Sequence, residues 1–287
     1  MTEYKCRSYA KINLFLDILS KEDSGYHKLK MIMQSVSLYD DLVFEPINRR
    51  RIEIDSNIPE INENNIIQKA FDVYADYYEE KMPNGFKVKL TKNIPMGAGL
   101  AGGSSNAAVA VSVFKKYFKL QIPKKKLLEL NHLIGSDVNF CYFGGTKCVE
   151  GVGDQLSALP KRDSFVLLVF PNIHMSSAEA YRLWDTQSDN YESGPVDSFS
   201  LYNAFEKVIL PMYPEIAILK DRVSSAGASN VMMTGSGSTV FGIFQDKLLC
   251  EEAKKTLSNN YKNIYVCRYV SKGFSIKKNY KKSREVL

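Results

Sequence analysis

Residues 93–110 read NIPMGAGLAGGSSNAAVA, and four glycines gather there between a stretch typical of a strand and a stretch typical of a helix. Glycine loses more backbone freedom on folding than any other residue, so the cluster indicates a backbone conformation or a close approach that other residues do not allow. A strand, a glycine-rich turn and a helix N-terminus together suit a phosphate group, because unpaired N–H groups and the positive end of the helix dipole face the anion. The stretch therefore predicts a phosphate-binding loop.

Three known types of phosphate loop do not fit this stretch. A Walker A loop needs lysine after its second glycine, and Gly103 stands there. Gly97, Gly99 and Gly102 satisfy the dinucleotide pattern, but the acidic residue required about 20 positions later is missing, since the first acid after the loop is Glu129. A protein-kinase loop requires the downstream sequences HRD and DFG, which do not occur. From the loop alone, a glycine turn that merely packs against a sheet stays open.

Four segments together resemble the GHMP kinase superfamily. PMGAGLAGGSSNAA (95–108) is similar to its second motif, and the others are YAKINLFLDI (9–18) with GYH (25–27), GSDVNF (135–140) and MTGSGSTVF (233–241). Within the superfamily they are most similar to the kinases that use ATP to phosphorylate the 2-hydroxyl of 4-diphosphocytidyl-2-C-methyl-D-erythritol, in the non-mevalonate (methylerythritol phosphate) pathway to isoprenoid precursors. Ala101 departs from the family, which usually has glycine there, and this leaves the backbone angle at that position open.

The patterning predicts an α+β protein of two domains. Residues 12–18 alternate, with Ile12 and Leu16 on one side and Lys11 and Asn13 on the other, which indicates a strand with one buried face. Pro160 and the charged residues after it suggest a domain boundary. The resemblance implies the GHMP kinase fold, with a ribosomal-protein-like α/β domain over 1–159, a ferredoxin-like α+β domain over 160–287, and the active site in the cleft between them.

Two residues are expected to be catalytic. An aspartate after Gly-Ser, such as Asp137, is by itself more typical of a helix N-cap, and Lys11 by itself suits a solvated strand lysine. The resemblance implies instead that Asp137 is the general base on the substrate hydroxyl and that Lys11 lies beside it. There the lysine would favour the alkoxide and the transferring phosphoryl group.

The resemblance also assigns the binding residues. Asn13 would contact the erythritol, His27 would hydrogen-bond the cytosine, and Tyr26 and Tyr181 would stack on its two faces. Ser104 and Ser105 could cap the following helix or offer hydroxyls to phosphate or a metal ion. The ATP-binding set is the loop Pro95, Met96, Gly97, Ala98, Gly99, Leu100, Ala101, Gly102, Gly103, Ser104 and Ser105.

A second glycine loop, Thr234–Thr239, would lie against the active site, although a plain hairpin turn has the same composition. Mg²⁺ is expected to accompany ATP. No metal site built by the protein is expected, because the three histidines lack the spacing of metal ligands.

Composition indicates the kind of protein and the cellular compartment to expect. The chain has 287 residues, of which 45% are apolar and 24% charged, as in ordinary globular proteins. No apolar run reaches the roughly 20 residues of a membrane span, and the N-terminus lacks the apolar core of a signal peptide. Five cysteines without a C-x-x-C pair suggest neither a disulfide framework nor a zinc site. We therefore expect a cytoplasmic enzyme with a small-molecule substrate; the sequence does not indicate its oligomeric state.

The net charge of +6 comes mostly from residues 271–287, which carry +5. This predicts a solvated, frayed basic end on a nearly neutral body rather than a nucleic-acid-binding face. Two alternatives remain at this point. One is a GHMP kinase of the homoserine or mevalonate type. The other is a non-catalytic nucleic-acid binder that uses its basic end, against which the neutral body and the Lys11–Asp137 pair argue.

Overall fold

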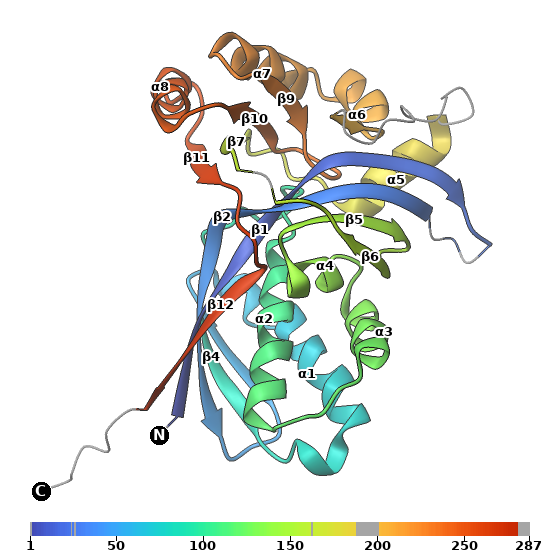
Figure 1. The fold of residues 1–287 in the computed structure, drawn as a ribbon, viewed down its shortest axis with the longest axis vertical. Coiled ribbons are helices and arrows are strands. Elements are labelled where there is room, and N and C mark those ends of the chain that lie inside the picture. Colours follow the sequence, from blue (N-terminus) through green and yellow to red (C-terminus); the bar gives the residue numbers. More distant parts are fainter. Residues whose placement is uncertain (1, 24, 26, 162, 188–200, 281–287) are drawn as a thin grey trace, which may run out of the picture.

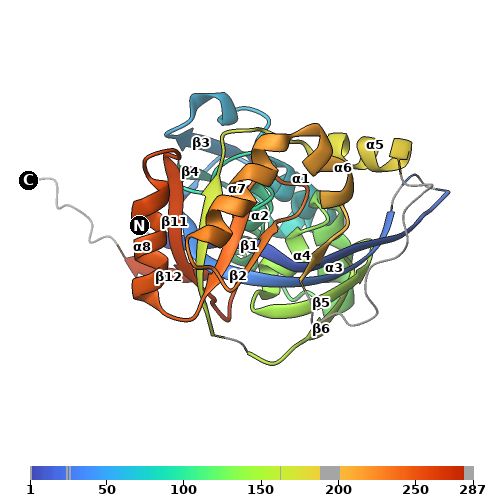
Figure 2. The same cartoon turned by 90° about the horizontal axis from the view of Figure 1, so that it is seen from above.

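The computed structural model describes residues 2–23, 25, 27–161, 163–187 and 201–280, and it has two β-sheets. The larger sheet has eight strands, in the order β12-β1-β2-β4-β3 with β5, β6 and β8 attached to its side. The smaller has four strands, in the order β11-β7-β10-β9. Helices α1 to α4 pack beside the first sheet, and α7 and α8 cover the second (Figure 1, Figure 2). The predicted α+β class is confirmed.

The strands of the first sheet are β1 (Thr2–Lys21), β2 (His27–Ile47), β3 (Ile52–Ser56), β4 (Gly85–Thr91), β5 (Thr146–Gly151), β6 (Gln155–Ala158), β8 (Tyr202–Asn203) and β12 (Phe274–Tyr280). Those of the second are β7 (Phe165–Phe170), β9 (Asn230–Met233), β10 (Val240–Phe244) and β11 (Asn263–Arg268). The helices are α1 (Ile66–Tyr77), α2 (Gly102–Tyr117), α3 (Lys124–Ile134), α4 (Val138–Phe143), α5 (Ser177–Gln187), α6 (Glu206–Met212), α7 (Pro214–Ser225) and α8 (Lys247–Leu257), with short 3-10 turns at Pro59–Ile61 and Glu79–Lys81.

Strand β1 runs between two hydrophobic clusters, and this corrects one expectation. The alternation over 12–18 predicted a single buried face, yet both faces are buried. Ile12 packs in a cluster with Val166 and Phe241 of the second sheet, whereas Leu16 belongs to the core under the first sheet. The polar side of the strand is therefore enclosed between the two halves, and Lys11 is 5% exposed rather than solvated.

Two irregularities in the β1–β2 pairing flank the polar residues of β1. The antiparallel register shifts between Tyr9 and Lys11 and again between Asn13 and Phe15. Such bulges bend a strand and turn individual side chains to new directions. Lys11 and Asn13 lie between the two shifts, at the point where the strand passes the glycine loop.

Helix α2 follows the glycine loop and is buried along most of its length. Its run from Ala107 to Val111 is fully buried, because small side chains let the helix pack closely between β1 and α1. No side chain caps its N-terminus. The first turn of α2 is therefore held in place by packing, while its leading end is left without a side-chain partner.

The chain end differs from the prediction. Residues 274–280 were expected to belong to a frayed tail and form strand β12 instead, which pairs antiparallel with β1 through Cys6–Ile276 and Ser8–Phe274. The last described strand thus follows β11 and lies in the first sheet. Residues 281–287 lie outside the described residues, and the domain boundary at 159/160 stays a prediction.

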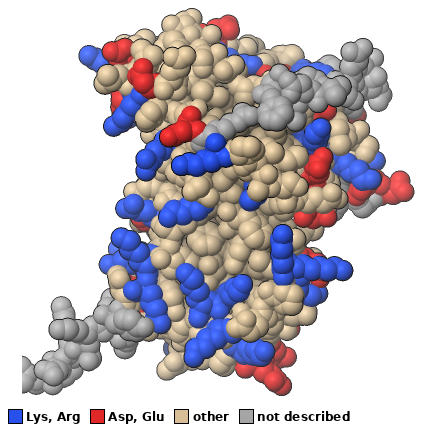
Figure 3. Space-filling model, viewed as in Figure 1, with Lys and Arg blue, Asp and Glu red and all other residues tan. Residues whose placement is uncertain are grey.

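The visible face in Figure 3 is uneven in charge: Lys and Arg side chains gather on its lower half, where the first sheet and its helices lie. Ion pairs on β1 include Lys5 with Glu3 at 3.4 Å, and Arg7 of β1 contacts Asp41 of β2 at 3.4 Å. Among the described residues, no helix combines the length and apolar character needed to cross a membrane.

Candidate active site

The glycine loop between β4 and α2 has a left-handed backbone at several positions, which glycine adopts readily. Gly97 and Gly99 have φ values of 59° and 74°, and Ala101, immediately before α2, has φ 53° and ψ 34°. This left-handed conformation at a residue with a Cβ costs about 1–2 kcal/mol. The glycine that the family usually has at this position would adopt the conformation without strain. The backbone angle at Ala101, which the sequence left open, is therefore left-handed and strained.

Backbone contacts from both halves of the chain fix the loop. The Lys11 N–H donates to the Leu100 carbonyl at 3.1 Å, and the Met175 N–H donates to the Gly97 carbonyl at 3.1 Å. Ser105 anchors the loop from below, because its hydroxyl donates to the Tyr9 carbonyl at 2.7 Å and its N–H donates to the Ala101 carbonyl at 2.9 Å. The structure therefore places Ser105 under the loop, with its hydroxyl engaged in packing rather than offered to a ligand.

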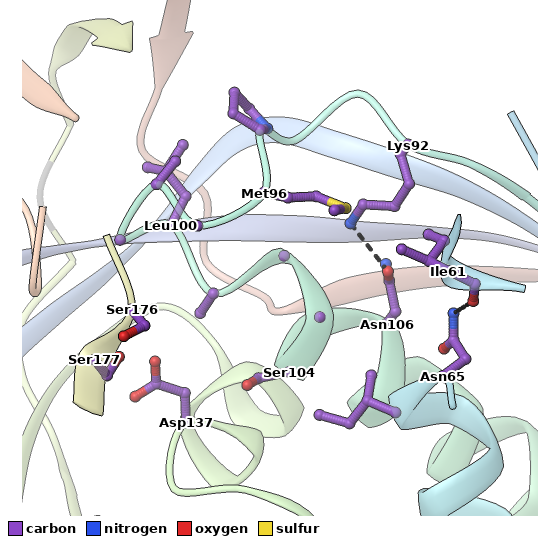
Figure 4. A pocket seen from close by; sticks show the side chains of 18 of the residues that line it. Ile61, Asn65, Lys92, Met96, Leu100, Ser104, Asn106, Asp137, Ser176 and Ser177 are labelled. Carbon is purple, nitrogen blue, oxygen red and sulfur yellow. Dashed lines mark hydrogen bonds between the residues drawn. The ribbon is translucent and has the colours of Figure 1, made fainter. Parts of the chain in front are cut away.

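A cavity of about 760 Å³ lies over the loop (Figure 4). It is lined by residues 95–104, by Asn65 and Ile66 at the start of α1, by Lys92, and by Asp137, Ser176 and Ser177 at one end. Every predicted ATP-binding residue except Ser105 lines it. The size is that of a typical small-molecule site.

Lys92, which the sequence did not single out, reaches the same cavity from the end of β4. Its ammonium group contacts the fully buried carboxylate of Asp40 and lies 3.1 Å from Asn106 Oδ1. Asp40 also accepts hydrogen bonds from the Asn93 and Ile94 N–H groups at 2.7 and 2.9 Å. A buried carboxylate with this many donors stays satisfied, and it fixes the entry to the glycine loop.

The two predicted catalytic side chains meet at the other end of the cavity. Lys11 Nζ lies 3.7 Å from Asp137 Oδ2 and donates to Asn13 Oδ1 at 2.8 Å. Asp137 directly precedes α4 yet makes no capping hydrogen bond, so the N-cap alternative is not what the structure shows. Its carboxylate points toward Ser177 across from Ser104 (Figure 4), and its side chain is 32% exposed.

A second cavity, of about 630 Å³, is lined by the same pair. It is lined among others by Asn13, His27, Tyr181, Arg182 and Asp185. The two cavities share the residues Lys11, Ser104, Asp137, Ser177 and Ser236. Groups held in the two cavities would therefore face each other at Lys11 and Asp137.

The second glycine loop, Thr234–Thr239, lies against the lysine. The Asn13 N–H donates to Thr234 Oγ1 at 2.9 Å, and Asn203 Nδ2 donates to the Gly235 carbonyl at 2.9 Å. A methyl group at Gly235 would lie 3.1 Å from Lys11 Nζ, and one at Gly99 would lie 2.2 Å from the Thr234 carbonyl oxygen. Glycine at these two positions lets the loops interlock around β1.

In the second cavity, His27 and Tyr181 stack face to face, with ring centroids 4.6 Å apart and an interplanar angle of 14°. His27 Nε2 lies 2.7 Å from Asp185 Oδ1. Burial, with Asp137 nearby, raises the pKa of the Tyr181 hydroxyl above its usual range, so the ring stays neutral. Tyr26 lies outside the described residues, and the predicted base sandwich stays a prediction.

Sequence reasoning missed Lys92, Asp185 and Ser177, while Ser236 lies in the second glycine loop that it placed against the site. Asp185 carries a local signal, since it follows Tyr181 by four residues and shares its helix face. Lys92 and Ser177 are identified by the tertiary fold alone. Among the described residues, no group of three or more His, Cys, Asp or Glu side chains could hold a metal ion.

Comparison with known proteins places this geometry in a family. The model of the GHMP kinases N terminal domain matches residues 65–145, and that of the GHMP kinases C terminal domain matches residues 189–263. The class defined by the fold and the site is thus that of the GHMP kinases.

Individual relatives narrow the assignment. The chain is 34% identical over 280 residues to 4-diphosphocytidyl-2-C-methyl-D-erythritol kinase of Clostridium botulinum (strain Eklund 17B / Type B), covering 92% of this chain and 99% of the relative. It is 36% identical over 283 residues to the kinase of the same name from Thermodesulfovibrio yellowstonii, covering 92% and 96%. A crystal structure of 4-(cytidine 5'-diphospho)-2C-methyl-D-erythritol kinase superposes with a TM-score of 0.80 at 25% identity, covering 92% of this chain and 98% of that one. The chain belongs to the 4-diphosphocytidyl-2-C-methyl-D-erythritol kinase family, which confirms the resemblance and the two-domain fold expected from it.

Proposed function

We propose that this protein transfers the γ-phosphoryl group of ATP to the 2-hydroxyl of 4-diphosphocytidyl-2-C-methyl-D-erythritol. The observation that carries the proposal is the meeting of two separate cavities at Lys11 and Asp137. Phosphoryl transfer depends mainly on positioning and charge stabilisation, and it needs a donor and an acceptor in line. One cavity for each, joined at a carboxylate–ammonium pair, provides that arrangement.

The first cavity suits the nucleotide. The uncapped start of α2 offers backbone N–H groups to an anion. A methyl group at Gly103 would have its nearest neighbour at 3.7 Å, so glycine there leaves free space that phosphate oxygens can enter. The ammonium groups of Lys11 and Lys92 also line this cavity, paired with Asp137 and Asp40.

Magnesium ion fits the end of the cavity that is lined by oxygen. Mg²⁺ prefers oxygen ligands, keeps several waters, and binds through one or two protein groups together with the substrate phosphates. The Asp137 carboxylate and the hydroxyls of Ser104, Ser176 and Ser177 are among the protein oxygens there, and Ser104 and Asp137 would be the ones to hold the ion. When bound, Mg²⁺ supplies neutralisation of the phosphate charge.

The proposed transfer step uses both members of the Lys11–Asp137 pair. Asp137 accepts the proton of the 2-hydroxyl as its oxygen bonds to the γ-phosphorus, while the bond from that phosphorus to the bridging oxygen breaks and ADP leaves. Lys11 faces the same point and stabilises the negative charge on the transferring group. Asn13 holds Lys11 in position through its Oδ1.

The second cavity suits the alcohol substrate. Asn13 would contact the erythritol beside the catalytic pair, while His27, Tyr181 and Tyr26 would hold the cytosine at the far end. The aromatic pair supports this because stacking together with hydrogen bonds to a base edge is the usual way of reading a nucleobase. We propose a cytoplasmic enzyme whose partners are these small molecules and not nucleic acid.

The test is a panel of alcohols. The purified protein is incubated with ATP, Mg²⁺ and, separately, the cytidyl substrate, homoserine and mevalonate, and the products are analysed by mass spectrometry. We expect a phosphorylated product, with matching ADP release, from the cytidyl substrate alone. Turnover of homoserine or mevalonate without turnover of the cytidyl compound would contradict the proposal, as would the absence of any turnover.

A further inference from the structure

A carboxylate outside the expected site contacts the histidine in the second cavity. Asp185 lies on α5, one turn after Tyr181, so both side chains face the cavity. Its Oδ1 lies 2.7 Å from His27 Nε2, and its Oδ2 lies 2.5 Å from Lys21 Nζ. The Tyr181 ring covers the face of the same imidazole at 4.6 Å. Two strands and one helix thus meet at Asp185.

These contacts keep Asp185 ionised. Partial burial opposes the charge, but hydrogen bonds from Lys21 and His27 outweigh it and hold the pKa of the carboxyl below its usual value. An ionised carboxylate has no proton to donate. The hydrogen of the His27–Asp185 contact therefore sits on Nε2 of the imidazole, and in the neutral ring Nδ1 is left as an acceptor.

We propose that Asp185 is a positioning residue that fixes His27 in this tautomer and so makes the second cavity select cytosine over uracil. This rests on the proposed function. Cytosine offers a 4-amino donor where uracil offers a 4-oxo acceptor. Nδ1 of His27, held as a hydrogen-bond acceptor, pairs with the 4-amino group of cytosine. With uracil, the lone pair of Nδ1 would face a lone pair of the 4-oxo group, and no hydrogen bond would form.

The substitution Asp185→Asn reverses the direction of the hydrogen bond between this residue and His27. Lys21 has only N–H donors, so it retains the amide oxygen, and the amide NH₂ turns toward His27. Nε2 then accepts, and the hydrogen moves to Nδ1. The tautomer that suited cytosine becomes the one that suits a 4-oxo pyrimidine.

The first measurement compares kcat/KM for the cytidyl substrate with kcat/KM for its uridyl analogue. We expect wild type to favour the cytidyl compound and Asp185→Asn to lower that ratio about tenfold or more, with the KM for ATP unchanged. Glu179→Gln is the control, because Glu179 lies on the same helix and hydrogen-bonds Tyr213 instead of His27; its ratio should match wild type. A merely structural role of Asp185 would lower both values together, and an unchanged ratio would overturn the proposal.

The second measurement does not depend on turnover. Nitrogen-15 NMR distinguishes protonated from unprotonated ring nitrogens, and only three histidines contribute signals, His27 being assigned by His27→Gln. We expect hydrogen on Nε2 in wild type and on Nδ1 in Asp185→Asn. Hydrogen on Nδ1 of wild-type His27 would overturn the inference, whereas failure of the wild type to phosphorylate the cytidyl substrate would contradict the proposed function instead.

Discussion

At the scale of single residues, Ala101 is the point where the glycine loop stores backbone strain. Ala101 has a left-handed φ of 53° and directly precedes helix α2. Loops that hold ligands often retain such strain because the surrounding packing determines the conformation. Here the hydrogen bonds from Lys11 and Ser105 to the adjacent backbone determine it.

We expect Ala101→Gly to stabilise the protein by about 1 kcal/mol, since glycine adopts this conformation without steric cost. Thermal unfolding should show an increase in Tm of about 2–4 °C. Ala107→Gly, in the buried interior of α2, is the matched control and should lower the Tm. A lower Tm for Ala101→Gly would show that the loop is not strained at this residue.

The Lys11–Asp137 pair is the second feature at this scale. We expect Asp137→Asn and Lys11→Ala each to lower kcat about 100-fold or more, because one removes the proton acceptor and the other the charge opposite the transferring group. The Kd for ATP, measured by titration, should change little. Lys89→Ala, on the exposed side of β4, is the control and should retain activity. Wild-type kcat in either pair variant would remove that residue from the mechanism.

At the scale of elements, the two glycine loops form one unit around β1. Gly99 faces the Thr234 carbonyl so closely that a methyl group would lie 2.2 Å from it, whereas a methyl group at Gly103 would meet only Ile66, at an ordinary contact distance of 3.7 Å. The glycines of this motif therefore have two roles: Gly99 permits close packing of the two loops, and Gly103 leaves room for a ligand.

This division predicts opposite behaviour for two similar changes. Gly99→Ala should lower both the Tm and kcat, since the loops must separate and even a 1 Å displacement costs about 100-fold in rate. Gly103→Ala should keep or raise the Tm, because alanine favours the helix, while it raises the KM for ATP. Equal effects of Gly99→Ala and Gly103→Ala on the Tm would contradict these separate roles of the two glycines.

The sequence predicted elements best where their stability is local. The glycine turn and the helix expected over 93–110 are present, with α2 beginning at Gly102, because a glycine cluster followed by small apolar residues is a local signal. Strand β12 was missed because its sequence, FSIKKNY, is rich in lysine and its partner β1 lies at the other end of the chain. Lys11, Asp137 and the loop lie in sequence motifs and were predicted from them. The contact of Lys92 with Asp40 joins residues distant in sequence and gives no local signal, whereas Asp185 has only the weak local signal of its spacing from Tyr181.

At the scale of the whole molecule, the returning chain end braces the helix that follows Asp137. Gly273, just before β12, packs so closely on α4 that a methyl group there would lie 1.7 Å from the Cys141 carbonyl oxygen. The Phe274 ring packs on Tyr142 of the same helix, with centroids 5.7 Å apart. The position of α4, and of Asp137 at its start, thus depends on the last strand.

We expect Gly273→Ala to destabilise the protein by about 1–3 kcal/mol, as overpacking of a dense interior does, and to lower kcat as α4 shifts. Circular dichroism melting curves and initial rates measure the two effects. Lys277→Ala, an exposed position on β12, should alter neither. Wild-type stability and kcat in Gly273→Ala would show that the chain end does not position α4.

The pairing of β12 with β1 also has a consequence for synthesis in the cell. Translation produces β1 long before its edge partner β12, so this hydrogen-bonding edge of β1 stays unpaired until β12 has emerged from the ribosome. The nascent chain can form the glycine loop before β12 is made, but α4 and Asp137 are braced only once β12 has paired with β1. Premature termination before Phe274 would therefore yield an inactive product with an open, aggregation-prone sheet edge.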